Sequence, residues 1–208
     1  MKLKIFLTAM AVCFMGLYGC GTASDKYISK YKGANGKYGF YNEKTGKQIS
    51  LPMWDEASFF YEGLAMVMFN NKGEKKYFYV DITGTVVIGV GYDAANIFYS
   101  YGYAHVAKKN EKGELKWGCI DKYGTEVVPL VYDKVSHLGF VKDLCAVANF
   151  DKEGKLKWGF IDKKLNTVIP FIYEGGKVSY GFSDGLAEVE LDGQKIYINT
   201  KGERVEKR

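Results

Sequence analysis

One serine in this chain stands in a pattern typical of hydrolase nucleophiles. The segment Gly181-Phe182-Ser183-Asp184-Gly185 matches Gly-x-Ser-x-Gly, in which a tight strand-to-helix turn exposes the serine to a histidine that comes later in the chain. The two histidines, His105 and His137, both precede Ser183, and no helical pattern follows the motif. We therefore interpret the motif as a turn rather than a catalytic site.

A second segment has the beginnings of a metal site. Residues 149–154 carry oxygen-bearing side chains at alternate positions and end in a glycine, which is the spacing with which a calcium loop begins. The acid that would close the loop at its twelfth position is replaced by Phe160, so we interpret the segment as a charged hairpin turn. Neither His105 nor His137 has a partner at zinc-ligand spacing, and we expect His105 on the surface of a strand. The sequence predicts no metal and no cofactor.

Three tyrosines are candidates for ligand binding. If residues 98–103 are extended, alternation places Tyr99, Tyr101 and Tyr103 on one face of the strand. Exposed tyrosines offer a flat apolar ring with a hydroxyl group, which both protein interfaces and sugar-stacking platforms use. The alternative is that these rings form the aromatic core of a β-unit.

The N-terminal residues 1–19 have the features of a lipoprotein signal peptide. A basic start at Lys2 and Lys4 precedes an apolar run, which is shorter than the roughly 20 residues of a membrane-spanning helix. The run ends in Leu17-Tyr18-Gly19-Cys20, which resembles a bacterial lipobox and predicts lipid attachment to the sulfur of Cys20. The alternatives are an ordinary signal cleavage near residues 21–23 and an uncleaved anchor. We expect residues 20–35, which are polar, to form a tether.

The chain contains an internal repeat of about forty residues, and this repeat sets the strands and turns on which the candidate residues lie. The repeat has three markers, which stay in phase along the chain. The first marker is an aromatic position at Tyr38, Tyr77, Trp117 and Trp158, continued as Lys195. The second is an Ala-x-Val strand whose alanine position is Ala65, Ala104, Cys145 and Ala187. The third is an aromatic-acidic pair at Trp54-Asp55, Tyr92-Asp93, Tyr132-Asp133 and Tyr173-Glu174.

The phrase Lys-Trp-Gly stands intact at residues 116–118 and 157–159, and with it the chain resembles the WG-repeat (KWG-repeat) proteins over roughly residues 35–205. We place the copies at about 37–75, 76–115, 116–156 and 157–194, with a half-copy at 195–205, in a repeat domain of residues 36–208. The resemblance implies a β-rich bacterial repeat with no catalytic residues. It implies structural roles for the Trp-Gly residues, which are Trp117, Gly118, Trp158 and Gly159.

The pattern within one copy predicts an all-β fold. In the fourth copy, residues 158–162 and 167–169 are predicted strands, the second stopped by Pro170, and residues 186–191 form a third strand before the turn at Asp192-Gly193. We predict tandem repeats of three to four antiparallel strands in an open solenoid-like stack, with a small β-propeller as the alternative.

The repeat also bears on the two cysteines of the domain. Cys119 replaces an aromatic residue of the other copies and Cys145 replaces an alanine, so both are expected to be apolar core residues. We favour a buried free pair. A disulfide remains the alternative, because an exported protein meets an oxidising compartment.

Charge and export together narrow the class of function. The chain has 29 basic and 24 acidic residues, so removal of Lys2 and Lys4 leaves 27 − 24 = +3, and the lysines are interleaved with acids, which argues against nucleic-acid binding. We predict a non-enzymatic protein-binding or scaffolding module at the outer membrane or cell surface, with a periplasm-facing position left open. Its partners would be an envelope protein and, through the lipid on Cys20, the membrane. The alternative is an envelope glycan-binding protein; an enzyme would need an acid/base site formed between copies.

Overall fold

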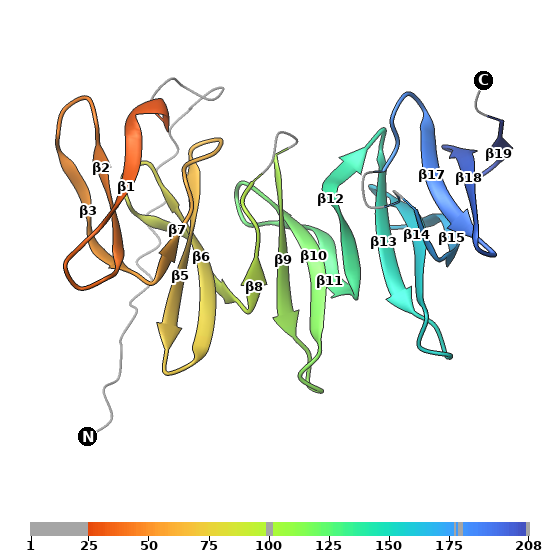
Figure 1. Ribbon diagram of the computed structural model, residues 1–208, viewed down its shortest axis with the longest axis horizontal. Coiled ribbons are helices and arrows are strands. Elements are labelled where there is room, and N and C mark those ends of the chain that lie inside the picture. Colours follow the sequence, from red (N-terminus) through yellow and green to blue (C-terminus); the bar gives the residue numbers. More distant parts are fainter. Residues whose placement is uncertain (1–24, 99–101, 177, 179–180, 207–208) are drawn as a thin grey trace.

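The computed structural model describes residues 25–98, 102–176, 178 and 181–206, and over these residues the fold is all-β, as predicted. Five small antiparallel sheets stand in a row along the longest axis of the molecule (Figure 1). Each sheet is a meander whose strands follow the order of the sequence. A short 3-10 helix, η1 (Asp25–Tyr27), precedes the first strand.

The first sheet has three strands and the other four sheets have four strands each. Sheet 1 contains β1 (Ile28–Lys32), β2 (Tyr38–Asn42) and β3 (Gln48–Trp54). Sheet 2 contains β4 (Glu56–Ala57), β5 (Leu64–Asn71), β6 (Glu74–Asp81) and β7 (Val86–Tyr92). Sheet 3 contains β8 (Ala94–Ala95), β9 (Tyr103–Lys109), β10 (Leu115–Asp121) and β11 (Glu126–Tyr132). Sheet 4 contains β12 (Lys134–Val141), β13 (Leu144–Phe150), β14 (Leu156–Asp162) and β15 (Thr167–Tyr173). Sheet 5 contains β16 (Gly175–Gly176), β17 (Leu186–Leu191), β18 (Gln194–Asn199) and β19 (Arg204–Val205).

The boundary between two sheets falls at the aromatic-acidic marker. Sheets 1 to 4 end at Trp54, Tyr92, Tyr132 and Tyr173. Sheets 2 to 5 therefore each draw their strands from two neighbouring sequence copies, and the half-copy 195–205 supplies β19 and most of β18.

Residues 28–32 do not belong to a tether, so that part of the prediction is wrong. They form β1, which pairs with β2 from Ile28↔Asn42 to Lys32↔Tyr38. Ile28 is buried in the cluster that joins sheet 1 to sheet 2. The local sequence is polar, and the strand is specified by pairing with β2 rather than by its own hydrophobicity.

Four hydrophobic clusters fill the four interfaces between the sheets. At each interface the middle strand of one sheet presents the residue two positions after the first marker to the Ala-x-Val strand of the next sheet. The facing sets are Phe40 with Ala65 and Val67, Tyr79 with Ala104 and Val106, Cys119 with Cys145 and Val147, and Phe160 with Ala187 and Val189. Because a sheet buries its apolar face only against its neighbour, the row should unfold as one cooperative unit.

The glycine of the Trp-Gly pair lies opposite a β-bulge. In sheet 4, Trp158 pairs with Tyr173 but Phe160 pairs with Ile169, so the extra residues of β15 crowd against Gly159. A Cβ added to Gly159 would lie 2.7 Å from the carbonyl oxygen of Ile169. The strand predicted to stop at Pro170 continues through it to Tyr173, because a bulge can leave the missing N–H of a proline out of the ladder.

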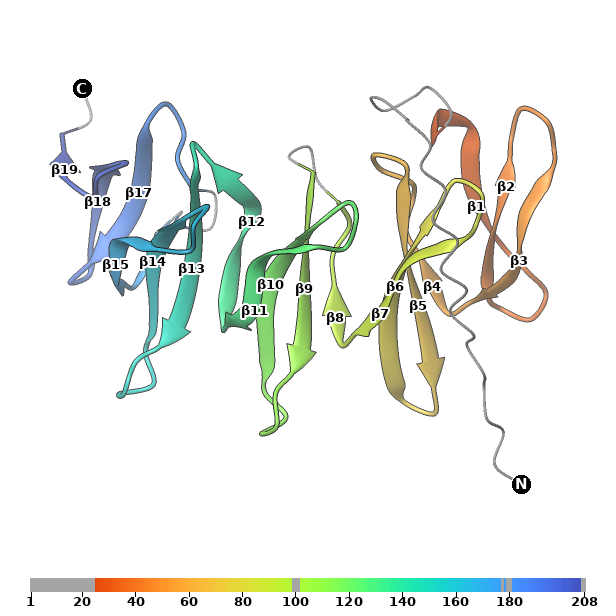
Figure 2. The ribbon, with the colours of Figure 1, turned by 180° about the vertical axis from the view of Figure 1, so that it is seen from behind.

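The row of sheets is open, as predicted, and does not close into a propeller. Sheet 1 and sheet 5 lie at opposite ends of the molecule in both views (Figures 1 and 2). The outward face of sheet 1 is polar: Ser29 donates a hydrogen bond to Glu43, and Gln48 donates one to the hydroxyl of Tyr31. At the positions of Ser29 and Tyr31 the next sheet has the buried pair Ala65 and Val67.

The outward face of sheet 5 is polar as well. Lys195 stands in the place of the first-marker aromatic, and the hydroxyl of Tyr197, two residues later, donates a hydrogen bond to Glu188. Polar outer faces on terminal repeats stop an array from growing or closing on itself. The two ends therefore explain the open architecture.

Candidate functional site

A lysine–acid pair recurs at each joint between sheets. The lysine directly before the first marker contacts the acid that follows the sheet boundary. The pairs are Lys37–Asp55 at 2.8 Å, Lys76–Asp93 at 2.7 Å, Lys116–Asp133 at 2.6 Å and Lys157–Glu174 at 2.7 Å. The lysine of the Lys-Trp-Gly phrase is thus a structural partner of the third marker, and sequence phase alone did not reveal this contact.

The same acids also bind the backbone of the following sheet. Asp55 Oδ2 accepts the amide N–H of Asn70 at 2.8 Å, and Asp93 Oδ2 accepts that of Lys109 at 2.8 Å. The hydrogen bond from Lys37, followed by that from Asn70, lowers the pKa of Asp55 despite partial burial. Burial acts to raise the pKa of Asp93, but the bonds from Lys76 and the Lys109 amide outweigh it and the net pKa is lowered. These carboxylates are ionised bridges between sheets, not poised acid/base catalysts.

The two tryptophans of the Trp-Gly pairs also lie at joints between sheets. Trp117 and Trp158 are half-buried and pack against the clusters between sheets 3 and 4 and between sheets 4 and 5. Gly118 is even more crowded than Gly159, because an added Cβ would lie 2.3 Å from the carbonyl oxygen of Val128.

The Gly-x-Ser-x-Gly segment is a turn, as interpreted from the sequence. Ser183 and Leu186 exchange backbone hydrogen bonds at 2.9 Å, and Asp184 and Gly185 between them have φ values of 52° and 82°. The turn leads into β17, which is a strand and not the helix that a nucleophile turn requires.

The calcium-like segment is the tip of the β13–β14 hairpin. Asp151 Oδ1 accepts the backbone N–H groups of Glu153 and Lys155 at 3.0 and 2.8 Å. These bonds, that to Lys155 first, lower the pKa of Asp151. Within the described ranges, no three His, Cys, Asp or Glu side chains are grouped to hold a metal ion.

His105 is not on a strand surface, so that expectation is wrong. It is only 2% exposed and lies directly across the strand pair from Cys119, within the interface between sheets 3 and 4. Exposure was expected because the polar Glu188 stands at the equivalent position of copy four. In the structure Glu188 lies on the outward face of sheet 5, whereas His105 lies on a face that sheet 4 covers.

Cys119 and Cys145 meet at this interface as free, buried thiols. A hydrogen bond between their side chains, together with burial, raises the pKa of Cys119. In the other three interfaces an aromatic ring fills this position. Here the ring of Phe140 packs edge-on against Tyr103 instead, with 6.1 Å between ring centroids.

The structure describes only one of the three candidate tyrosines, Tyr103. Tyr103 is half-buried and packs on Phe140, whereas Tyr99 and Tyr101 lie outside the described residues.

The loop of sheet 2 that corresponds to this segment, between β4 and β5, is described. Its residues Phe59 and Tyr61 are 68% and 41% exposed, and the ammonium group of Lys30 lies 4.7 Å from the Phe59 ring centroid. These two aromatics were not predicted as exposed, although Phe59-Phe60-Tyr61 occupies in copy one the place of the tyrosine run in copy two.

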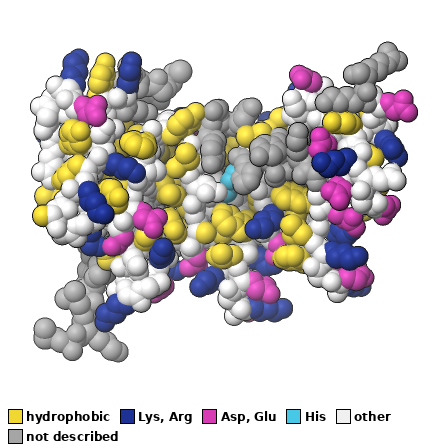
Figure 3. All heavy atoms as spheres, viewed as in Figure 1, with side chains coloured by type: hydrophobic (Ala, Val, Ile, Leu, Met, Phe, Trp, Pro, Cys, Tyr) yellow, Lys and Arg dark blue, Asp and Glu magenta, His cyan; other side chains and the backbone are white. Residues whose placement is uncertain are grey.

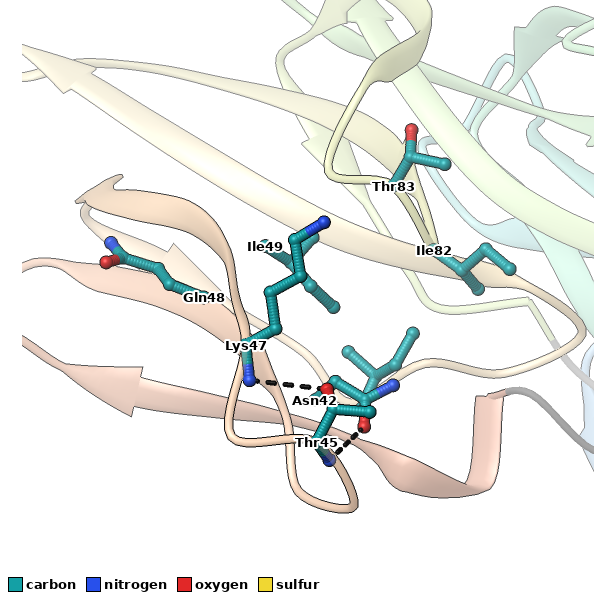
Figure 4. A pocket seen from close by; sticks show the side chains of 8 residues that line it. Asn42, Thr45, Lys47, Gln48, Ile49, Ile82 and Thr83 are labelled. Carbon is teal, nitrogen blue, oxygen red and sulfur yellow. Dashed lines mark hydrogen bonds between the residues drawn. The ribbon is translucent and has the colours of Figure 1, made fainter.

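A cavity of about 440 Å³ opens between the β2–β3 turn and the β6–β7 turn (Figure 4). The β2–β3 turn is one residue longer than its counterpart, since Asn42 N bonds Lys47 O whereas Asp81 N bonds Thr85 O. The lining consists of Ile28, Asn42, Thr45, Lys47, Gln48, Ile49, Ile82 and Thr83. None of these carries a carboxylate, imidazole or thiol group, so the cavity has no acid/base pair.

Apolar side chains are exposed on the outer edge strands of sheets 1 to 4. They are Leu51, Met53, Val86, Val87, Val90, Val131, Val168 and Ile172. Charged side chains of both signs are interspersed over the face shown in Figure 3, without a field of one sign. The outer edges therefore suit protein contacts better than binding to a polyanion.

Cys20 lies outside the described residues. Among the residues that are described, none belongs to a helix with the length and apolar character needed to cross a membrane.

The model of one protein family, WG containing repeat, matches residues 38–72, 77–112, 117–149 and 158–194. No curated protein matches the sequence. Among solved structures, the crystal structure of TolB from Acinetobacter baumannii is similar, with a TM-score of 0.39 and 11% sequence identity. The similarity covers 87% of this chain and 51% of the TolB chain, so this chain spans about half of that protein's length.

Proposed function

Because the chain belongs to the family of WG-containing repeat proteins, we propose that it is a non-catalytic protein-binding or scaffolding module, held at the cell envelope by a lipid on Cys20. The observation that carries the proposal is the open row of five sheets with exposed apolar edge strands. Repeat arrays use such extended surfaces to bind partners. Asp55, Asp93 and Glu174, whose pKa values are lowered, are committed to the joints between sheets, which supports a role without acid/base chemistry.

The test is crosslinking of the tagged full-length protein in cells, followed by mass spectrometry of what it captures. We expect one reproducible envelope protein, with crosslinks on the outer edge strands or on the β4–β5 loop. Capture of nothing above background, with the protein expressed and anchored, would contradict the scaffolding role.

The anchor has its own test. Cys20→Ala should release soluble protein and abolish palmitate labelling, because the thioether-forming sulfur is lost. Unchanged membrane labelling of the variant would rule out lipid attachment at this residue.

A second candidate function, binding of envelope glycan, is favoured by the exposed aromatics Phe59 and Tyr61. Their loop corresponds in the repeat to the segment of Tyr99 and Tyr101, so the two loops could present stacking surfaces for sugars. Phe59→Ala and Tyr101→Ala should each weaken retention on purified cell-wall polysaccharide. Tyr123→Ala is the matched control, since Tyr123 is 77% exposed in the β10–β11 turn, and equal retention of all three variants would exclude this candidate.

A further inference from the structure

Over the residues that the structure describes, sheet 1 lacks a strand that the other four sheets have. In sheets 2 to 5 an inner strand (β4, β8, β12 or β16) pairs with the Ala-x-Val strand; β12 has eight residues and the other three have two each. In sheet 1 the place of the Ala-x-Val strand is taken by β1. One edge of β1 pairs with β2, and no described strand pairs with the other edge.

The register shows which backbone groups this edge offers. The amide N–H of the acid at each sheet boundary donates to a carbonyl opposite the first marker: Asp55 to Met68, Asp93 to Ala107, Asp133 to Ala148 and Glu174 to Glu190, at 2.8–2.9 Å. In sheet 1 the residue opposite the first marker is Lys32, which pairs with Tyr38. The carbonyl and N–H of Lys32 thus point away from β2, as do those of Lys30.

The filled edges also define what the missing strand looks like. The backbone N–H of the acid donates to the carbonyl just described. Two positions after the acid stands a small residue or valine (Ala57, Ala95, Val135 or Gly176). The residue three positions after the acid donates its N–H to the next carbonyl along the edge, as Ser58 does to Met66 O. The acid's carboxylate then accepts an N–H further along the Ala-x-Val strand, as Asp55 does from Asn70.

The charge of β1 fits the same partner. The strand contains Lys30 and Lys32 and no acid, and the helix before it carries one acid and one lysine, Asp25 and Lys26. Lysines on an edge strand disfavour pairing with basic or neutral strands, including a second copy of β1. An acidic strand is the complementary occupant.

We propose that the free edge of β1 binds an extended acidic segment of a partner protein, which adds to sheet 1 as its fourth strand with the pattern acid, any residue, small residue. This is strand addition, in which main-chain hydrogen bonds provide affinity and side chains provide selectivity. The inference rests on the proposed protein-binding function and names its surface and partner chemistry.

The test uses the purified full chain in detergent and a labelled synthetic peptide with the sequence of residues 51–58, which contains the acid and inner strand that normally complete sheet 2. A control peptide carries amides in place of the acids corresponding to Asp55 and Glu56. We expect saturable binding in fluorescence anisotropy, a weakening of about tenfold or more for the control peptide, and slowed hydrogen exchange at the amides of Lys30 and Lys32.

Two variants examine the edge itself. Lys32→Pro removes a donor that faces away from β2, and prolines are tolerated at such positions, so binding should be lost while the fold is kept. Lys32→Glu reverses the charge without touching the backbone and should weaken binding, whereas the matched control Lys122→Glu, in the β10–β11 turn, should not.

Failure of the wild-type chain to bind, or equal binding of both peptides, would overturn the inference. So would slow exchange of the Lys30 and Lys32 amides without peptide, which would mean that the chain's own N-terminal segment occupies the edge. Crosslinks from a cellular partner that fall on other strands would retain the binding function while rejecting this surface.

Discussion

The glycine of the Trp-Gly pair is required by the backbone of the neighbouring strand. The β-bulge brings a carbonyl group so close to Gly118 and Gly159 that any side chain would collide with it. Copy two has Phe78 at this position and keeps the same register shift. There the glycine lies across the pair, at Gly91, whose φ is 68° and whose added Cβ would lie 3.3 Å from the Phe78 ring. The two strands approach each other closely in both sheets. The glycine that permits this approach lies on the middle strand in sheet 4 and on the outer strand in sheet 2.

Gly159→Ala should therefore lower the free energy of unfolding by about 1–3 kcal/mol, the usual cost of overpacking. Gly89→Ala is the control, because its added Cβ would only meet Val86 at 3.7 Å and should change stability little. Urea unfolding of both variants measures the difference. Equal stability would mean that the bulge relaxes without cost.

The two thiols between sheets 3 and 4 should be unreactive in the folded protein. Burial shields both, and the raised pKa of Cys119 lowers its thiolate fraction. Iodoacetamide should label Cys119 and Cys145 about a hundredfold more slowly in buffer than in urea, as followed by peptide mass spectrometry. A mass 2 Da lower for the linked peptides would instead identify a disulfide.

The element that joins successive sheets is the lysine–acid bridge. Each acid holds the lysine of its own sheet boundary and an amide of the next sheet, so it fixes both the angle and the register of the joint. Exposed ion pairs contribute little by themselves, but Asp93 is largely buried, with 15% side-chain exposure, and its loss would leave a backbone N–H without a carboxylate.

Stability should consequently fall in acid. The pKa values of Asp55, Asp93 and Glu174 are lowered in the folded protein, so folding favours their ionised forms. Their contribution is present above the unfolded pKa near 4 and is lost as pH falls through the lower folded values. Urea midpoints between pH 7 and pH 2.5 measure this loss. Lys76→Met should flatten the dependence, and an unchanged slope in that variant would contradict a role for the Asp93 bridge.

At the scale of the whole molecule, the end faces decide the architecture. Polar residues occupy the positions where inner sheets present apolar ones, so sheet 1 and sheet 5 do not pack on each other. The result is an elongated row in place of a ring (Figures 1 and 2).

Small-angle scattering of the repeat domain in solution tests this shape. A compact chain of about 180 residues would have a radius of gyration of about 16 Å, and the open row should exceed that value clearly at concentrations where the protein is monomeric. A radius near the compact value would indicate a closed ring.

The sequence alone was enough for the strand-rich class and the period of about forty residues, because these depend on local alternation, turn residues and the phase of short markers. It favoured an open stack but left a small propeller as the alternative. It also predicted that Cys119 and Cys145 are apolar core residues, which the structure confirms. It did not reveal where one sheet ends and the next begins, the bulge that carries β15 through Pro170, the burial of His105 or the lysine–acid bridges. Those features depend on which strands pair and which faces are covered, and both are long-range choices. For the same reason only the tertiary structure could show that β1 belongs to sheet 1 and has one edge with which no described strand pairs.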